Sequence, residues 1–515
     1  MDYSTEFFLA LISLGLITSF LMEGWLQSRP LLFWQRGWAC NTVHIGLYFF
    51  GLGVLLLLIQ RVTVAVLLLF LVQLIIVAVS NTKEKTLREP FLHCDFEYFR
   101  DAIRHPRLYL PFFGYAKAAI LVLGGISIFT LLLYVRRPVT EVYASWGILV
   151  SAELLLIMLS ALAIGIAGKH LPLMTLEPLK DMQRCGLLSF LYGYRTLEKS
   201  TRIQDKAPFE RSRCDSISLN QKPDLVTIQA ESFFDPRPVF SCLRNDLLPH
   251  WDRLCSESIS NGPLDTGPWG ANTVRPEFEF LTGLSSAQIG VHQFQPYRTL
   301  GLQPLPTIAT WFKSLGYRTI AIHPYEKCFY NRDKIYPNLG FDEFIDISHF
   351  KDAALAGGYV SDVALGEFVA DMLAQPCSQP RYIHVVTMEN HGPYDITSGL
   401  EKTQDPLSSE IPEQSSELDV YARHLQNTDA LLELVANSLS AQDSPGALCV
   451  FGDHVPILTH AYEALGYPDG HTNYLIWNAA DKKHTAHEKA LSVEHLAQTF
   501  LTAVGMPSPS ESASD

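Results

Sequence analysis

Five long apolar segments in the first 170 residues limit the fold of this chain more than any other feature of its sequence. They lie at residues 7–25, 43–59, 62–79, 112–134 and 146–167. A helix needs roughly 20 predominantly apolar residues to cross the hydrocarbon core of a bilayer. No basic region precedes the first segment and no small-residue cleavage site follows it, so we interpret it as a retained helix rather than a signal peptide. The sequence therefore predicts a domain of five transmembrane helices over residues 1–168.

The charged residues that flank these segments bear on orientation. Arg29, Arg36 and six basic residues between 81 and 108 lie on the same side as the C-terminal part of the chain. Cytoplasmic loops are usually rich in Lys and Arg, so this pattern favours a cytoplasmic C-terminal part. Residues 81–108 also contain five acidic residues and two prolines, and they could form an interfacial segment instead. Two charged residues, Lys117 and Glu153, fall within predicted spans, and we expect snorkelling or pairing inside the bundle rather than lipid handling.

From Pro223 onwards, short apolar runs alternate with longer helical patterns. The runs cover residues 224–229, 317–322, 381–387, 447–451 and 473–477, and the helical patterns include 306–315 and 418–439. Alternation of this kind is typical of an α/β domain with a mixed, largely parallel sheet. The sequence predicts this domain over residues 223–505. It also predicts a linker along the membrane face at 169–222 and a disordered tail at 506–515.

Charge and cysteine content narrow the function. Residues 1–170 carry 13 basic and 10 acidic residues, a net charge of +3, so the −14 of the whole chain leaves −17 for residues 171–515. Nucleic-acid-binding surfaces are basic, so this acidity argues against a nucleic-acid partner and leaves room for metal sites made of carboxylates. The nine cysteines include no CxxC pair. A disulfide between Cys242 and Cys255 is open from sequence alone.

Four of the five apolar runs end in polar residues of the kinds that bind metals or phosphate. These residues are Glu231 after the first run, His323 after the second, His391 after the third, and Asp453 with His454 after the fourth. Ligand sites in open α/β sheets form at the carboxyl ends of strands. Carboxylate and imidazole donors suit one divalent cation, with Mn²⁺ preferred here and Mg²⁺ or Zn²⁺ as alternatives.

Two further stretches add the hydroxyl of Thr273 and the guanidinium of Arg332 to the candidate site residues. The sequence GPWGANTVRPEFEFLTG, residues 267–283, presents Thr273 on a loop rich in glycine and proline. The sequence HPYEKCFYNRDKIYPNLGFDEF contains His323, Tyr330 and Arg332, of which the Arg fork suits a phosphate oxyanion. The alternative for Arg332 is a surface ion pair with Asp333 or Asp342.

Together these motifs resemble the lipoteichoic acid synthase family of the alkaline phosphatase and sulfatase superfamily. The matching pieces are VTIQAESF, GANTVRPEFEFLTG, HPYEKCFYNRDKIYPNLGFDEFID, ENHGPY and FGDHVP. The resemblance implies that Glu231, Thr273, Asp453 and His454 bind the metal, with Thr273 also the nucleophile. It implies that the phosphoglycerol head group is held by His323, Tyr330, Arg332 and His391. Many members of this family have Trp where Tyr330 stands, which leaves the head group open.

The resemblance also implies an activity and a location. The expected enzyme is a membrane-anchored transferase that moves sn-glycerol phosphate from phosphatidylglycerol to Thr273 and then to a glycan or glycolipid acceptor. Its catalytic domain would lie outside the cytoplasm, on a bacterial inner (plasma) membrane. The alternatives are phosphoethanolamine transfer, sulfate-ester or phosphodiester hydrolysis, and a non-catalytic membrane scaffold. Thr273 is followed by Val-Arg-Pro, so the formylglycine modification of true sulfatases is not expected.

Overall fold

The computed structural model describes residues 5–134, 145–201, 208–209, 222–401, 403–481 and 487–506. The chain divides into two compact units, residues 1–201 and residues 202–515. Most of the predicted linker beyond residue 201, and the predicted tail from residue 507 on, lie outside the described residues.

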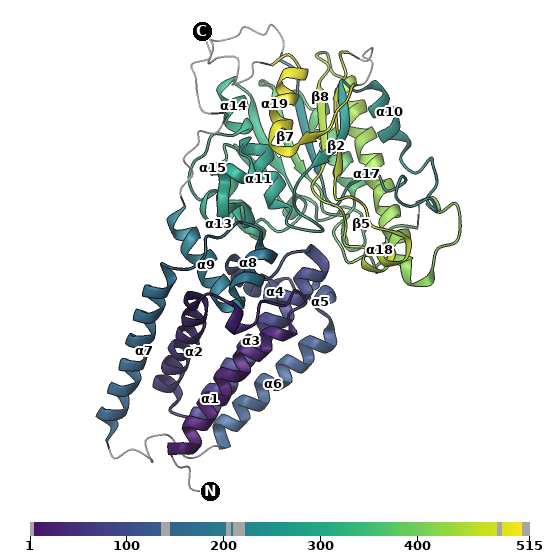
Figure 1. Cartoon of the computed structure of the whole chain (residues 1–515). Coiled ribbons are helices and arrows are strands. Elements are labelled where there is room, and N and C mark those ends of the chain that lie inside the picture. The colour runs from purple at the N-terminus through teal and green to yellow at the C-terminus, as the bar shows by residue number, and fades with distance from the viewer. Residues whose placement is uncertain are drawn as a thin grey trace. The chain divides into compact units, whose positions relative to one another are not determined.

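The first unit contains five helices long and apolar enough to cross a membrane (Figure 1). They are α1 (Thr5–Met22), α2 (Trp38–Ile59), α3 (Val62–Leu87), α6 (Tyr115–Tyr134) and α7 (Trp146–Gly168). A left-handed Gln60 with φ of 57° ends α2, and α3 begins two residues later, which makes a tight hairpin. These helices confirm the five spans predicted from hydropathy.

Short helices accompany the membrane spans. They are η3 (His93–Glu97), α4 (Tyr98–Arg104), α5 (Pro106–Phe113), α8 (Pro178–Cys185) and α9 (Leu187–Ser200). Helix α9 contacts α2 and η3. It is anchored at its first residue, where the Leu187 N–H donates to the buried Glu23 carboxylate over 2.7 Å. The same carboxylate forms an ion pair of 2.6 Å with Arg36.

Polar side chains inside the membrane unit bind one another. Glu153 of α7 accepts hydrogen bonds from the Gln60 amide at 2.9 and 3.1 Å. This is the pairing inside the bundle expected from the sequence for an acidic residue in a span. Lys117 lies near the start of α6 and is exposed.

The second unit is built on a nine-stranded mixed sheet in the order β10-β2-β9-β8-β1-β7-β3-β4, with β11 also pairing β2. Its strands are β1 (Leu225–Ala230), β2 (Ser260–Asp265), β3 (Arg318–Ile322), β4 (Glu343–Ile345), β7 (Arg381–Val386), β8 (Ala447–Gly452), β9 (Thr472–Asn478), β10 (His487–Glu488) and β11 (Leu491–Ser492). Strands β8, β1, β7, β3 and β4 run parallel, whereas β9 is antiparallel to both β8 and β2. The prediction of a mixed, largely parallel sheet is confirmed.

Helices cover both faces of this sheet, and alternate residues of β1 point to opposite faces. Val226 and Ile228 belong to a core shared with α10 (Pro249–Glu257), α16 (Asp362–Ala374) and α17 (Ser416–Ser440). Leu225 belongs to a second core, shared with α11 (Val274–Thr282), α14 (Ile308–Ser314), α15 (Arg332–Asn338) and α19 (Val493–Ala503). The unit is therefore a three-layer α/β domain.

The sequence did not predict β2 or the direction of β9. Strand β2 contains Gly262 and Pro263, residues that normally weaken a strand. Gly262 has φ of 146°, and a Cβ there would lie 2.6 Å from the Lys489 carbonyl oxygen. The position therefore needs glycine because another backbone approaches it closely.

Glu279 provides a test of the packing of α11. Burial raises the pKa of its carboxyl to about 8, and Glu494 adds to the rise. A carboxyl whose pKa is raised on folding stabilises the folded state below pH 4.5, and this stability is lost as the pH rises towards 8. We expect Glu279→Gln to keep the hydrogen bond from Ser286 and to remove this loss, which amounts to about 1.4 kcal/mol per pH unit in that window.

The measurement is the melting temperature of the full-length protein in detergent from pH 5 to pH 8. The difference between Glu279→Gln and wild type should grow with pH. Glu488→Gln, in the exposed strand β10, is the control and should follow wild type. Parallel pH curves for wild type and Glu279→Gln would show that Glu279 is charged in the folded protein.

Candidate active site

Four adjacent parallel strands end at the same edge of the sheet, in the order β8, β1, β7, β3. The residues that follow them are Asp453 and His454, Glu231, Glu389 to His391, and His323. Parallel strands bring their carboxyl ends to one edge, so residues far apart in sequence become neighbours there. The polar residues predicted from sequence therefore line one edge of the domain.

Glu231, Asp453 and His454 form a compact buried cluster whose donor atoms all lie within 4.8 Å of one another. His454 Nε2 is 3.4 Å from Glu231 Oε1 and 3.4 Å from Asp453 Oδ2. His454 Nδ1 lies 3.1 Å from the Val455 carbonyl oxygen. A neutral ring that donates from Nδ1 to this carbonyl leaves the Nε2 lone pair directed at the carboxylates.

Ser232 holds this cluster together. Its N–H donates to Asp453 Oδ1 at 2.8 Å, and its hydroxyl donates to Glu231 Oε1 at 3.1 Å. It achieves this with φ of 52°, a left-handed conformation that is unusual for serine. Sequence analysis did not assign Ser232 a role, although its place directly after Glu231 at a strand end was a usable signal.

Thr273 lies beside the cluster, at the N-cap of α11. Threonine at this position usually accepts a hydrogen bond from the first turn of its helix, but the Thr273 side chain makes no such bond. Its hydroxyl instead donates to Glu231 Oε2 at 3.2 Å. The Gln229 amide donates to the Thr273 carbonyl oxygen at 3.0 Å, and Asn272 has φ of 77°. Strand β1 and a strained turn therefore fix where this hydroxyl points.

The electrostatics of the cluster favour a bound cation. Burial raises the pKa of Glu231 to about 8, and the Asp453 carboxylate adds to the rise. Asp453 Oδ2 and His454 Nε2 are buried without a hydrogen-bond partner. Two carboxylates, one imidazole and one hydroxyl are donors that Mn²⁺, Mg²⁺ and Zn²⁺ all accept. These residues therefore fit one divalent cation, which would neutralise the charge and occupy the unpaired donors.

Arg332 lies in the interior of the domain and pairs with Glu277. The Arg332 Nη2 to Glu277 Oε2 distance is 2.6 Å, and the two side chains are 1 and 0 % exposed. Tyr297 and Tyr336 also donate to Glu277 Oε1, at 2.6 and 2.7 Å. Burial alone would raise the pKa of Glu277, but Arg332 holds it below its usual value. The alternative from sequence, a surface pair with Asp333 or Asp342, is wrong.

This pairing changes what Arg332 can contribute. Because the Glu277 carboxylate already neutralises the guanidinium, Arg332 brings N–H donors to the site rather than an uncompensated charge. Glu277 lies in the stretch 267–283, and nothing in that stretch identifies a partner for it. Glu277 and Arg332 are 55 positions apart, so no local pattern identifies the pair.

The loop before Arg332 is strained. Tyr330 and Asn331 have φ of 54° and 56°, consecutive left-handed values for residues other than glycine. The Arg332 guanidinium carbon lies 5.4 Å from the centre of the Tyr330 ring, within the range of a cation–π contact. Such strain persists only where the surroundings impose it, and it concentrates at functional sites.

His323 is buried and neutral. Burial, followed by the Arg332 charge, lowers its pKa to about 3. Its Nδ1 lies 3.0 Å from the Val386 carbonyl oxygen, and its Nε2 is buried without a partner. A neutral ring that donates from Nδ1 offers Nε2 as an acceptor, which suits a hydroxyl group better than an anionic oxygen.

His391 lies in the turn after β7, with Nδ1 2.7 Å from the Gly392 carbonyl oxygen. Arg332 and His391 both act electrostatically on His323 and contribute to its lowered pKa. Glu389 fixes the start of the turn because its Oε1 is bound by His424 Nδ1 and by the Asn427 amide, each at 2.7 Å. Sequence analysis did not assign His424 or Asn427 to the site.

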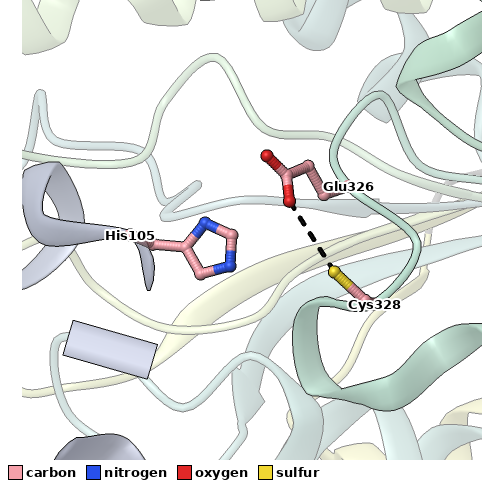
Figure 2. A group of neighbouring side chains, drawn as sticks. All are labelled: His105, Glu326 and Cys328. Atoms are coloured by element: carbon pink, nitrogen blue, oxygen red, sulfur yellow. Dashed lines mark hydrogen bonds between the residues drawn. The ribbon is translucent and has the colours of Figure 1, made fainter. Parts of the chain in front are cut away.

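Cys328 is a cysteine close in sequence to Tyr330 and Arg332. The Cys328 thiol donates to Glu326 over 3.6 Å (Figure 2). Burial, followed by the Glu326 charge, raises the pKa of Cys328, so the unreactive thiol form is favoured. Cys242 and Cys255, the pair considered from sequence, are both free thiols.

Comparison with known proteins agrees with this architecture. The sulfatase family model matches residues 223–506. A Rhizobium meliloti protein named for the modification of cyclic beta-1,2-glucan is 30% identical over 253 residues, which cover 49% of this chain and 38% of that protein. The lipoteichoic acid synthase of Staphylococcus saprophyticus is 25% identical over 189 residues, which cover 35% of this chain and 28% of that protein.

One solved structure extends the likeness to the membrane unit. It is an integral membrane protein, lipooligosaccharide phosphoethanolamine transferase A (EptA) from Neisseria meningitidis. The match has a TM-score of 0.55 at 14% identity and covers 90% of this chain and 88% of that chain. At this identity the match concerns the fold alone. The chain spans less than two fifths of the length of the two relatives described above.

The buried cluster yields a prediction about metal content. Asp453→Asn removes one carboxylate charge, so the full-length protein, dialysed after purification, should retain at least about tenfold less divalent metal than wild type. The measurement is inductively coupled plasma mass spectrometry. The matched control is Asp371→Asn, an exposed acid of α16, which should retain the wild-type amount. Equal metal in Asp453→Asn and wild type would remove the cluster as the binding site.

Proposed function

The chain belongs to the sulfatase family, and we propose that it is a membrane-anchored, metal-dependent transferase of sn-glycerol phosphate. Phosphatidylglycerol is the donor, and a glycan or glycolipid is the acceptor. The catalytic domain lies outside the cytoplasm of a bacterial cell, where such acceptors are found. The resemblance to the lipoteichoic acid synthase family supports the choice of head group, and the relative named for glucan modification supports a glycan acceptor.

The observation that carries the proposal is the Thr273 hydroxyl directed at a buried cluster of metal-binding side chains. Thr273 leaves its helix uncapped and donates to Glu231 instead. A divalent cation held by Glu231, Thr273, Asp453 and His454 would lower the pKa of the hydroxyl and polarise the phosphoryl group. Without such activation an aliphatic hydroxyl is a weak nucleophile near neutral pH.

The transfer takes place in two steps. Thr273 Oγ1 forms a bond to the phosphorus of phosphatidylglycerol, and the bond from phosphorus to the diacylglycerol oxygen breaks. The Thr273 hydroxyl, which donates to Glu231 Oε2, releases its proton as this bond forms, and the departing oxygen takes up one proton to give diacylglycerol. A hydroxyl of the acceptor then attacks the phosphorus and releases its own proton. The bond from phosphorus to Thr273 Oγ1 breaks, and Oγ1 takes up a proton to restore the hydroxyl.

The remaining residues bind the head group. Arg332, oriented by Glu277, donates N–H groups to the phosphoryl oxygens. The unpaired Nε2 of His323 accepts a hydrogen bond from a glycerol hydroxyl. Tyr330 covers the glycerol, and His391 binds the phosphoryl group together with Arg332. Phosphoethanolamine has an ammonium group where glycerol has hydroxyls. Nε2 of His323 would therefore accept its hydrogen bond from an N–H group in one case and from an O–H group in the other.

The test of the nucleophile is a covalent adduct. The purified full-length protein is incubated with phosphatidylglycerol and no acceptor, and the peptide that contains Thr273 is weighed after digestion. Wild type should release diacylglycerol and carry a glycerol phosphate adduct on Thr273. Thr273→Ala should release none, whereas Thr273→Ser keeps the hydroxyl and should retain part of the activity.

The outcomes separate the alternatives. Full activity of Thr273→Ala would show that another group attacks the phosphorus. Diacylglycerol release without any adduct would favour direct transfer to water or acceptor. Parallel incubations with phosphatidylethanolamine decide the head group, because an ethanolamine phosphate adduct in place of the glycerol phosphate adduct would identify a phosphoethanolamine transferase.

Arg332 provides a second prediction. Arg332→Lys keeps the charge opposite Glu277 but loses the planar fork, so turnover of a fluorescent phosphatidylglycerol should fall by about tenfold or more. Arg318→Lys is the matched control, because Arg318 forms a half-exposed ion pair with Glu343 at 2.6 Å. If Arg332→Lys turns over the lipid as fast as wild type does, the positive charge at this position is sufficient and the planar fork is not needed.

A further inference from the structure

A groove of about 260 Å³ lies within the membrane unit. It is bounded by α1, α2, α3 and α9, which are labelled in Figure 1, and by the short helix η3. Most of its wall is apolar and includes Leu47, Leu69, Ile76 and Leu191. This volume is too small for another helix, which is about 10–12 Å wide with its side chains. It suits a slender, flexible occupant.

The polar side chains in the membrane-spanning part of the wall are satisfied by the protein itself. The Gln73 amide donates to the Ser19 carbonyl oxygen at 2.7 Å, and the Ser19 hydroxyl lies 2.9 Å from His44 Nε2. These bonds leave Gln73 and Ser19 little to offer a polar ligand. The deep part of the groove therefore favours hydrocarbon.

The rest of the groove wall includes exposed apolar side chains and two polar side chains. Val72 of α3 and Phe96 of η3 line it and are 53 and 44 % exposed, which is typical of lipid-facing side chains in a membrane unit. Arg195 of α9 and His93 of η3 line it outside the membrane-spanning helices. His93 is paired with Glu198 at 3.1 Å. Arg195 is exposed and has no ion-pair partner within the described part of the chain.

We propose that this groove binds one acyl chain of an anionic glycerophospholipid, with the lipid phosphate at Arg195. An acyl chain gains little hydrophobic energy here because it leaves one apolar environment for another. Selectivity therefore comes from Arg195, an unpaired cation at the polar part of an apolar groove. The site is a lipid-binding site of the membrane unit, and it does not depend on the transfer reaction.

The experiment uses full-length protein with Thr273→Ala, so that no turnover consumes the lipid. The protein is reconstituted with phosphatidylglycerol or phosphatidylcholine carrying a photoactivatable group on one acyl chain, and the labelled peptides are identified by mass spectrometry. Phosphatidylglycerol should label peptides of α3 and α9. Val72→Trp puts a larger side chain on the wall of the groove and should lower this labelling by about fivefold or more for both lipids. Leu123→Trp, on the similarly exposed α6, is the matched control and should leave it unchanged.

Arg195→Gln should remove the preference for phosphatidylglycerol over phosphatidylcholine, a loss of about fivefold for one cation facing an anionic lipid. Arg195→Lys should restore part of it. Two results would overturn the groove as a binding site. One is equal labelling of Val72→Trp and Leu123→Trp, and the other is labelling of α6 in wild type that is as strong as that of α9. An unchanged preference in Arg195→Gln would overturn the phosphate contact. Neither result bears on the adduct at Thr273, so the two proposals fail independently.

Discussion

Two carboxylates, Glu231 and Asp453, are buried close together at the ends of neighbouring strands. Their mutual repulsion is unfavourable, and several groups of the second unit are placed to offset it. Ser232 and the backbone N–H of His454 donate to them, and His454 turns its Nε2 towards both. These contacts leave Asp453 Oδ2 unpaired and the pKa of Glu231 raised. A cluster of this kind is stable as a set of charged groups only with a cation among them.

A second buried charge is handled differently. The charge of the Arg332 guanidinium is neutralised within the protein by Glu277, whose carboxylate also accepts hydrogen bonds from two tyrosine hydroxyls. The domain thus places a strong anionic cluster and a neutralised donor group at one edge of the sheet. A phosphodiester carries its charge on oxygen atoms that accept hydrogen bonds, so a site with one open cation position and fixed N–H donors suits it better than a site with two unpaired positive charges.

The membrane unit follows the same rule that buried polar groups bind one another. Glu153 is paired with Gln60, and Glu23 with Arg36, inside this unit. Arg195 differs because it lines an apolar groove and has no ion-pair partner among the described residues. A charge that the protein does not neutralise can bind a ligand of opposite charge. For this reason we propose a lipid at this groove and a cation at the cluster beside Thr273.

The sequence by itself determined the five membrane helices, the α/β domain, and which strand ends carry Glu231, His323, His391 and Asp453, because hydropathy and strand alternation are local properties of the chain. The tertiary structure alone decided that β9 runs antiparallel, that Ser232 joins the carboxylates, and that Glu277 rather than Asp333 or Asp342 meets Arg332. The physical reason is that an ion pair or a strand pairing depends on which surfaces meet in three dimensions. Partners that are far apart in the sequence leave no local pattern that identifies them.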